Sequence, residues 1–235
     1  MSDSTGVTGP QVPDVTWVTE PPVLEVSPEA VGVSVTRFQQ SVEFYGSIPG
    51  DPEAVTKENP DGDTDLSNRM NRHKGGALLI ARIIDKKADA SNKNLSVFEY
   101  TLAGEPLALM QLSTRGGALE IENLASHPGT EMAGGIMVEF ALNRIAHFNA
   151  NSQDKQLMED MIVLNSMNPS STAAWIALGF VPLGKNPDLT GHLNPIPMSL
   201  DANKSPKWTK LDNKWRHVAY ATKPNYLKAY KPKTI

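Results

Sequence analysis

Two short glycine-bearing turns divide one long apolar stretch of the sequence into three segments. The turns are Ala103-Gly104-Glu105 and Arg115-Gly116-Gly117, and the segments around them are LSVFEYTL, PLALMQLS and ALEIENLAS. Apolar runs of this length separated by glycine turns are typical of hairpins, because glycine adopts the backbone angles that tight turns require. The sequence therefore predicts an antiparallel meander of three strands, the third from Ala118 to about Ser126.

The segments before the meander predict a mixture of strand, helix and loop. Residues 23–46 can hold one strand and one short helix, and Leu66 to about Asp89 has the apolar spacing of a helix. Between them lies a long acidic loop, at about 47–65, that is full of turn residues.

The segments after the meander alternate between helix and strand. Apolar residues at helical spacing predict a helix from about Met132 to Asn149. The face of this helix opposite the apolar residues carries a polar stripe made of Glu139, Asn143 and His147. The remaining predicted elements are a buried strand in MEDMIVLNSM, a short helix from Asn168-Pro169 to Gly179, a strand starting at Phe180, a Pro- and Asn-rich loop over about 184–206 and a last strand at 215–222.

The length of 235 residues suits one domain with extensions or two small domains, and the segment pattern favours the first. Residues 1–22 are rich in Pro, Ser, Thr and Gly and predict an extended or disordered arm, 23–222 the folded domain, and 223–235 a basic tail. The first 65 residues are strongly acidic, whereas residues 185–235 are strongly basic. Either the two ends attract each other across the fold, or they steer a charged protein partner.

Several classes of protein are disfavoured by what the sequence lacks. The chain has no cysteine, which excludes disulfides, zinc-thiolate sites and a cysteine nucleophile. No apolar run is long enough for a membrane helix, and the N-terminus lacks a secretory signal pattern, so a cytoplasmic location is the simplest expectation. The lysines are spread rather than clustered, so no nucleic-acid partner is expected. The five histidines and the DGDTD segment lack metal-ligand spacing, so no metal is expected.

The stretch ALEIENLASHPGTEMAGGIMVEFAL places a glycine pair, Gly134-Gly135, at the mouth of a helix directly after a strand. Two explanations are open. The glycines let helix and strand pack closely, or they clear backbone N–H groups for a bound phosphate, since a helix N-terminus attracts anions through its dipole and its unpaired N–H groups.

The strand before this loop carries two acids, Glu120 and Glu122, which lie two residues apart and therefore on the same face of a regular strand. Such a pair can accept a proton from an amine, which is mostly protonated at neutral pH, or attract a cationic substrate. The alternative is that both acids lie on a solvated face of the sheet.

Residues 95–182 resemble the GNAT superfamily of acyl-CoA-dependent N-acetyltransferases. The resemblance consists of the meander ending in LEIENLASHP, the glycine-bearing loop and helix EMAGGIMVEFAL, and the segment NPSSTAAWIALGFVPLG with its Leu-Gly-Phe. It implies an α/β (α+β) fold with a mixed, mainly antiparallel sheet flanked by helices and splayed central strands. It also implies transfer of an acetyl or other acyl group from acetyl-CoA to an amine by direct attack in a ternary complex.

The resemblance assigns roles to particular residues of this chain. It implies Glu120, with Glu122 beside it, as the catalytic base. Two of the residues implied to bind the cofactor have alternative roles: Asn168 can be a helix N-cap, and Trp175 can be a packing residue. The implied cofactor-binding residues are Leu124, Ala125, Ser126, Glu131, Met132, Ala133, Gly134, Gly135, Ile136, Asn168 and Trp175.

The sequence departs from the family's pattern at three of these positions. Glu131 stands where the family has Arg or Gln, Ile136 where it has Gly or Ala, and Trp175 where many members have a tyrosine general acid. The acceptor is expected to be an amine on a small molecule or on a protein. A catalytically inactive GNAT-like domain that binds CoA or a protein partner, through its acidic N-terminal region or basic tail, is the alternative.

Overall fold

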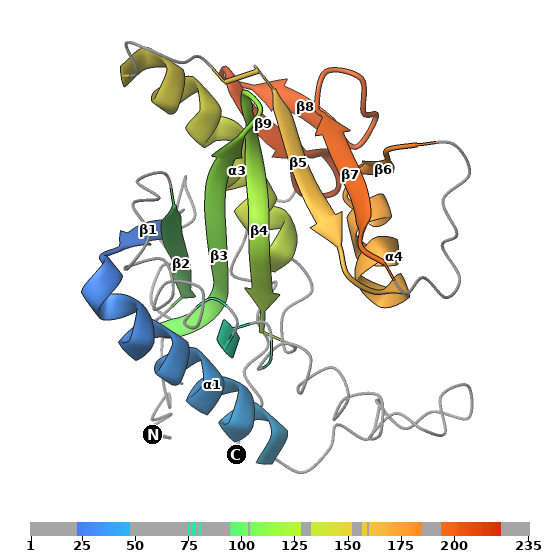
Figure 1. Cartoon of the computed structure of the whole chain (residues 1–235). Coiled ribbons are helices and arrows are strands. Elements are labelled where there is room, and N and C mark those ends of the chain that lie inside the picture. Colours follow the sequence, from blue (N-terminus) through green and yellow to red (C-terminus); the bar gives the residue numbers. More distant parts are fainter. Residues whose placement is uncertain are drawn as a thin grey trace, which may run out of the picture.

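The computed structural model describes residues 23–47, 75, 77–78, 80, 95–102, 104–127, 133–151, 157–158, 160–184 and 194–221. The predicted arm, acidic loop and basic tail lie outside these residues, as does most of the helix predicted over 66–89. Figure 1 shows a twisted sheet between helices. The elements are β1 (Val23–Val26), η1 (Pro28–Ala30), α1 (Val31–Ser47), β2 (Ser96–Leu102), β3 (Glu105–Arg115), β4 (Ala118–Ser126), α3 (Ala133–Asn151), β5 (Met161–Ser166), α4 (Pro169–Ala177), β6 (Val181–Pro182), β7 (Ile196–Asp201), β8 (Trp208–Leu211), β9 (Lys214–His217) and α5 (Val218–Ala221).

Seven strands form one sheet in the order β1-β2-β3-β4-β5-β7-β6, and β8 and β9 form a separate hairpin. All neighbours in the large sheet are antiparallel except β4 and β5, which are parallel. The predicted meander is β2-β3-β4, and its second turn has positive φ angles of 58° at Gly116 and 81° at Gly117. The expected fold class, a mixed and mainly antiparallel sheet flanked by helices, is confirmed.

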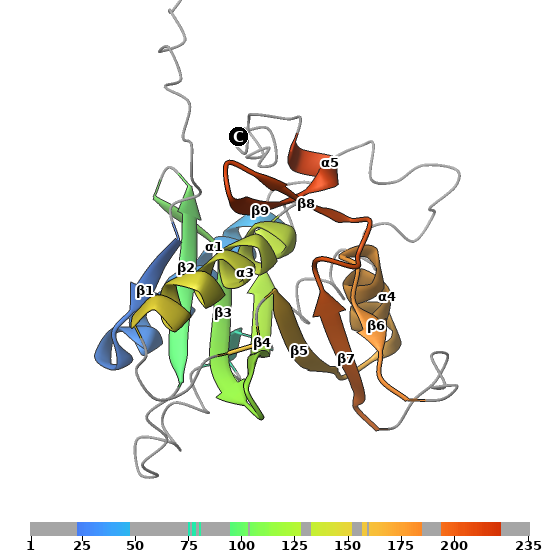
Figure 2. The same cartoon turned by 90° about the horizontal axis from the view of Figure 1, so that it is seen from above.

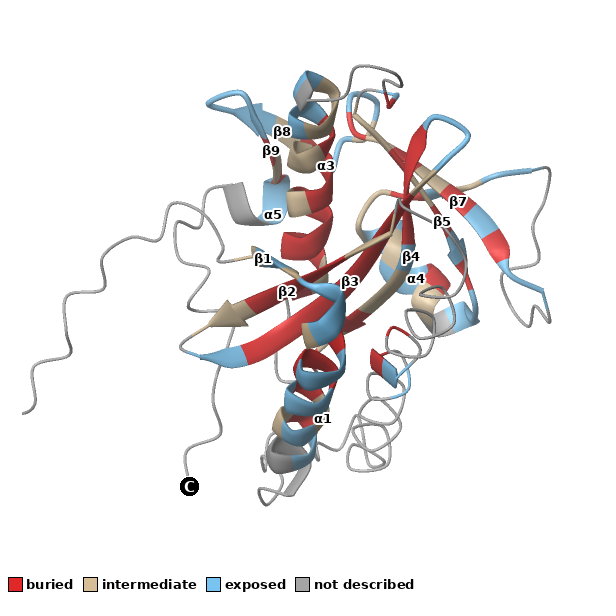
Figure 3. Cartoon of the chain, turned by 60° about the vertical axis from the view of Figure 1, so that its left-hand side comes forward, coloured by how far each residue is buried: buried red, intermediate tan, exposed pale blue. Residues whose placement is uncertain are grey.

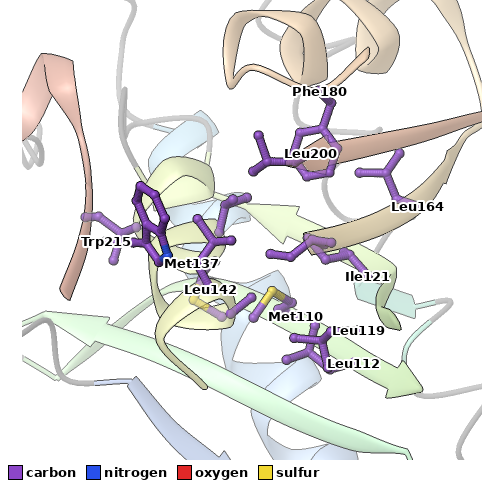
Figure 4. Close-up of a cluster of buried hydrophobic side chains, with 14 of the residues drawn as sticks. Met110, Leu112, Leu119, Ile121, Met137, Leu142, Leu164, Phe180, Leu200 and Trp215 are labelled. Carbon is purple, nitrogen blue, oxygen red and sulfur yellow. The ribbon is translucent and has the colours of Figure 1, made fainter. Parts of the chain in front are cut away.

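Helices cover both faces of the sheet, and each face has its own apolar core. The larger core joins α3 to residues such as Met110, Leu112, Leu119 and Ile121 of the meander (Figure 4). The other core joins α1 to alternate positions of the same strands, among them Leu109 and Ala125. Figure 2 shows α3 lying across the strands, and Figure 3 shows the buried residues along the inner sides of both helices. The period-2 alternation of strand side chains creates these two faces.

The C-terminal part of the chain differs from the sequence prediction. The loop predicted over 184–206 contains β7, whose Ile196, Met198 and Leu200 are buried while Pro197 is exposed. This strand lies between β5 and β6 in the sheet. The strand predicted over 215–222 ends at His217, because residues 218–221 turn into α5.

Two residues of the predicted polar stripe on α3, Glu139 and Asn143, lie against β9, whereas the third, His147, is exposed. Asn143 bonds the backbone of Trp215 twice, accepting from its N at 2.8 Å and donating to its O at 3.1 Å. Glu139 is buried and pairs with Arg216. The Trp215 indole N–H also donates to Asp160 at 2.5 Å. Buried polar groups need partners, and here the hairpin supplies them.

His217 of β9 provides a test of this docking. Burial lowers the pKa of His217 below its ordinary value, and the positive charge of Lys207 lowers it further. The unfolded chain therefore takes up a proton first as the pH falls below about 6.5, and the fold loses stability. We expect the melting temperature to decline between pH 7 and pH 5, and to decline less in His217→Gln. Circular dichroism melts at several pH values check this, with His147→Gln on the exposed side of α3 as control. Equal slopes in all three proteins would contradict it.

Candidate functional site

The two central strands of the sheet separate soon after they meet. β4 and β5 pair over three positions only, from Leu119 opposite Ile162 to Ile121 opposite Leu164. Beyond this point β4 continues to pair with β3 as far as Ser126, and β5 continues to pair with β7. Figure 1 shows the two strands diverging toward their carboxyl ends. We call the last shared positions, Ile121 and Leu164, the vertex.

The divergence leaves part of the β4 backbone without a strand partner on one side. In a sheet, the N–H and C=O groups of a strand alternate between its two neighbours. For residues 122–126, the groups directed away from β3 have no partner on β5 within the described strands. Leu124, Ala125 and Ser126, predicted to hold the cofactor, lie in this segment. Such groups can pair with an extended ligand that lies along the strand.

The N-terminus of α3 lies against this same segment of β4. A Cβ added to Gly134 would lie 3.7 Å from the Cδ2 of Leu124, an ordinary contact distance. Gly134 is also not among the described glycines with positive φ. Neither crowding by the described residues nor backbone conformation therefore requires glycine here, although glycine disfavours a helix by up to about 1 kcal/mol. This result weakens the close-packing explanation for Gly134 and favours a reason outside the fold itself.

The other residues predicted to bind the cofactor at the start of α3 are buried where the structure describes them. Ala133 and Gly135 are buried at the start of α3. Ile136 is completely buried in the core beneath the helix, so its side chain does not narrow an approach from outside and only its backbone could meet a ligand. Glu131 and Met132 lie outside the described residues.

Glu120 lies next to the vertex and is only 4% exposed. Its Oε1 accepts from the Asn165 amide of β5 at 3.2 Å and lies 3.4 Å from Nη1 of Arg115. The Asn165 contact joins β4 to β5 where the strands begin to separate. The solvated-face alternative is therefore wrong for Glu120, whose carboxylate is held by specific partners.

Glu122 occupies a β-bulge that sequence analysis does not predict. Leu112 pairs with Ile121 and Gln111 pairs with Asn123, so Glu122 has no opposite residue on β3. The Glu122 side chain is exposed and accepts from Ser113 Oγ at 2.7 Å. Because Ser113 pairs with Glu120, both acids lie on the same face, as the strand period predicts. Bulges often redirect side chains next to active sites.

Asn168 caps α4. Its Oδ1 accepts from the Ser171 backbone N–H at 2.8 Å, and the Ser171 side chain completes a capping box. Asn168 is therefore a helix N-cap in the structure, as the alternative predicted, and its role in cofactor binding stays a prediction. Trp175 packs edge-on against Phe180, with ring centroids 5.2 Å apart, and lies against the larger core.

Two substitutions separate the two roles of Asn168. Asn168→Ala should lower the free energy of unfolding by about 1 kcal/mol, because α4 loses its cap. Asn168→Ser keeps a capping oxygen and should change stability by less than about 0.5 kcal/mol. If the amide also contacts the cofactor, both variants weaken acetyl-CoA binding equally in calorimetry. Unchanged affinity in Asn168→Ser would leave Asn168 with a capping role alone.

Two features are absent from the described residues. These residues contain no group of three acidic or histidine side chains placed to hold a metal ion. None of the described helices is long and apolar enough to span a membrane.

No protein-family model and no curated protein sequence matches the chain. Solved acetyltransferase structures resemble it at low identity. PaiA N-acetyltransferase from Thermoplasma acidophilum, in complex with coenzyme A, is 11% identical with a TM-score of 0.42, over 76% of this chain and 97% of that one. The IAA acetyltransferase from Bacillus cereus is 12% identical with a TM-score of 0.42, over 76% and 97%. A GNAT family acetyltransferase from Elizabethkingia anophelis with acetyl-CoA bound is 12% identical with a TM-score of 0.38, over 51% and 82%. Similarity at this level assigns neither activity nor substrate to this chain.

Proposed function

We propose that the chain is an acyl-CoA-dependent N-acetyltransferase that moves an acetyl group from acetyl-CoA to an amine. One observation carries the proposal. The unpaired edge of β4, at residues 122–126, lies directly against the glycine-bearing N-terminus of α3. The edge of β4 can bind an extended polar chain, and the N-terminus of α3 can bind an anion. The donor substrate contains both groups, because its pantetheine arm is an extended polar chain and its diphosphate is an anion.

The start of α3 is suited to a diphosphate. The first four N–H groups of a helix have no partner within the helix, and the helix dipole adds a partial positive charge. Gly134 lies at this position without a side chain, although its surroundings would admit one. The backbone of Ala133 to Ile136 would donate to the phosphate oxygens. Glu131 and Met132 remain predicted members of this site.

The edge of β4 is suited to the pantetheine arm and the thioester. The amide groups of that arm would pair with the outward backbone groups of Leu124, Ala125 and Ser126, as an added strand would. One of these N–H groups would also stabilise the oxyanion that forms when the amine attacks the thioester carbonyl. The separation of β5 from β4 makes both contacts possible.

The acids on β4 have the chemistry to accept a proton from the acceptor amine. An amine attacks as a free base, so its proton must leave for a carboxylate, directly or through a water chain. Glu120 is proposed as that base and Glu122 as its neighbour that attracts the ammonium group. The new N–C bond then replaces the C–S bond, the CoA thiolate departs, and the second proton of the amine goes to that thiolate through solvent. Trp175 has no acidic hydroxyl, so we assign no general acid.

Calorimetry and a turnover assay together test this function. Titration of the full chain with acetyl-CoA should give one site per chain, and thiol release should depend on an added primary amine. Binding without any amine-dependent release across a broad amine panel would favour the inactive CoA-binding alternative. Absence of binding would contradict the proposal and favour the protein-interaction alternative.

A further inference from the structure

A strip of polar side chains runs along β3 and β4 on the face that carries Glu120. Glu120 bonds Asn165, Glu122 bonds Ser113, and the Asn123 Nδ2 donates to the Gln111 Oε1 at 2.7 Å. The bulge at Glu122 creates this arrangement, because Glu122 and Asn123 both contact side chains of β3 on one face. A regular strand would direct Asn123 to the opposite face.

The Gln111–Asn123 pair retains hydrogen-bonding capacity that the described residues do not use. Gln111 is completely buried, and its Nε2 has no hydrogen-bond partner within the described part of the chain. Asn123 is half-buried and lies on β4 beyond the vertex. Its Oδ1 accepts no hydrogen bond from any described residue. A buried donor without a partner destabilises a fold, so its presence calls for an explanation, and a role at a ligand site is one.

Asn123 therefore offers one acceptor, its Oδ1, and one donor, the second hydrogen of its Nδ2, beside the acids, whereas Gln111 is too deeply buried to meet a ligand itself. Gln111 and Ser113 are neighbouring same-face positions of β3, about 7 Å apart along an extended strand. Because Ser113 pairs with Glu120, the Gln111–Asn123 pair lies about that distance from the proposed base. A group that both donates and accepts, such as a carboxamide or a hydroxyl, matches the Asn123 amide. An acceptor with an aliphatic or aromatic group at this place would leave that amide unsatisfied.

We propose that Asn123, held in place by Gln111, positions an acceptor in which the reacting primary amine is accompanied by an amide or hydroxyl group a few bonds away. This inference rests on the proposed acetyl transfer. Asn123 acts as a specificity-determining residue, and Gln111 acts through it as a positioning residue. The bound acceptor directs its amine to Glu120 and its second polar group to the Asn123 amide.

Two probe amines of equal shape test the inference in the full chain. 4-Aminobutanamide carries a carboxamide three methylene groups from its amine, and 4-methylpentylamine replaces that carboxamide by an isopropyl group. With acetyl-CoA as donor, kcat/KM should favour the amide by about tenfold or more, the discrimination of one well-placed hydrogen bond or two.

Isosteric variants locate the origin of that preference. Asn123→Leu should bring the ratio of the two kcat/KM values close to one, chiefly by raising KM for the amide with little change in kcat. Gln111→Leu should lower the ratio by about threefold without loss of stability, because it also removes a buried donor that lacks a partner. Gln40→Leu, the same type of exchange on the exposed side of α1, is the control and should leave the ratio unchanged.

Each possible result of these assays either supports or overturns the role of Asn123. A wild-type ratio near one, or a ratio that Asn123→Leu does not reduce, overturns the inference. If calorimetry shows acetyl-CoA binding but neither probe is acetylated, the role of Asn123 is overturned while the cofactor site stands. If acetyl-CoA does not bind, the inference falls together with the proposed function.

Discussion

Gly134→Trp is expected to weaken acetyl-CoA binding by at least about 100-fold. A Cβ at this position already contacts Leu124, so an indole has to cover the start of α3 and block its backbone N–H groups, to which the diphosphate would bind. Loss of two charge-assisted hydrogen bonds, each contributing about 1.5–3 kcal/mol, gives an effect of this size. Calorimetric titration of wild type and variant measures it.

Two further variants separate ligand binding from folding. Gly32→Trp places the same side chain on α1, where an added Cβ meets nothing within 4 Å, and should bind acetyl-CoA normally. Gly134→Ala should fold as well as wild type, or more stably by up to about 1 kcal/mol, because alanine favours a helix and fits against Leu124. Its affinity should nevertheless fall. Unchanged affinity in both Gly134 variants would show that no ligand approaches this glycine.

Glu120→Gln is expected to lower kcat/KM for a primary amine by about 100-fold at pH 7. The substitution keeps the shape of the side chain and removes the base, and general base catalysis contributes about 10²–10⁴-fold. The deficit should shrink as the pH rises toward about 10, where the amine loses its proton to solvent. A pH profile of thiol release with 4-aminobutanamide measures both effects.

Controls distinguish catalysis by Glu120 from a structural role. The carboxylate also joins β4 to β5 through Asn165, so Glu120→Gln can affect stability. A lower melting temperature with an unaltered pH profile would indicate that structural role alone. Glu43→Gln, an exposed acid on α1, should leave turnover unchanged. Glu122→Gln should lose less activity than Glu120→Gln.

Local sequence patterns predicted the central part of the fold. The glycine turns define β2, β3 and β4, and apolar spacing defines α3. The sequence pattern does not reveal strand β7, because its alternation covers only Ile196 to Asp201 and includes Pro197, a residue type that disfavours strands, next to an Asn- and Pro-rich segment. The β8–β9 hairpin has strands of four residues each, too short for a periodicity signal.

The site was predictable only where it depends on local spacing. The two-residue period places Glu120 and Glu122 on one face, and this geometry is present. The bulge that adds Asn123 to that face depends on register with β3, and the contact of Asn165 with Glu120 depends on parallel pairing with β5. Both arise from strand pairing between segments distant in sequence, which spacing along one segment does not encode.

The proposed coenzyme A site at the start of α3 and the edge of β4 is best tested by a crystal structure of the full chain grown with coenzyme A. We expect diphosphate oxygens within hydrogen-bond distance of the backbone N–H groups of residues 133–136. We also expect the pantetheine amides to pair with the edge of β4 at residues 124–126. Coenzyme A bound elsewhere, or a β4 edge in contact with protein atoms alone at saturating ligand, would contradict it.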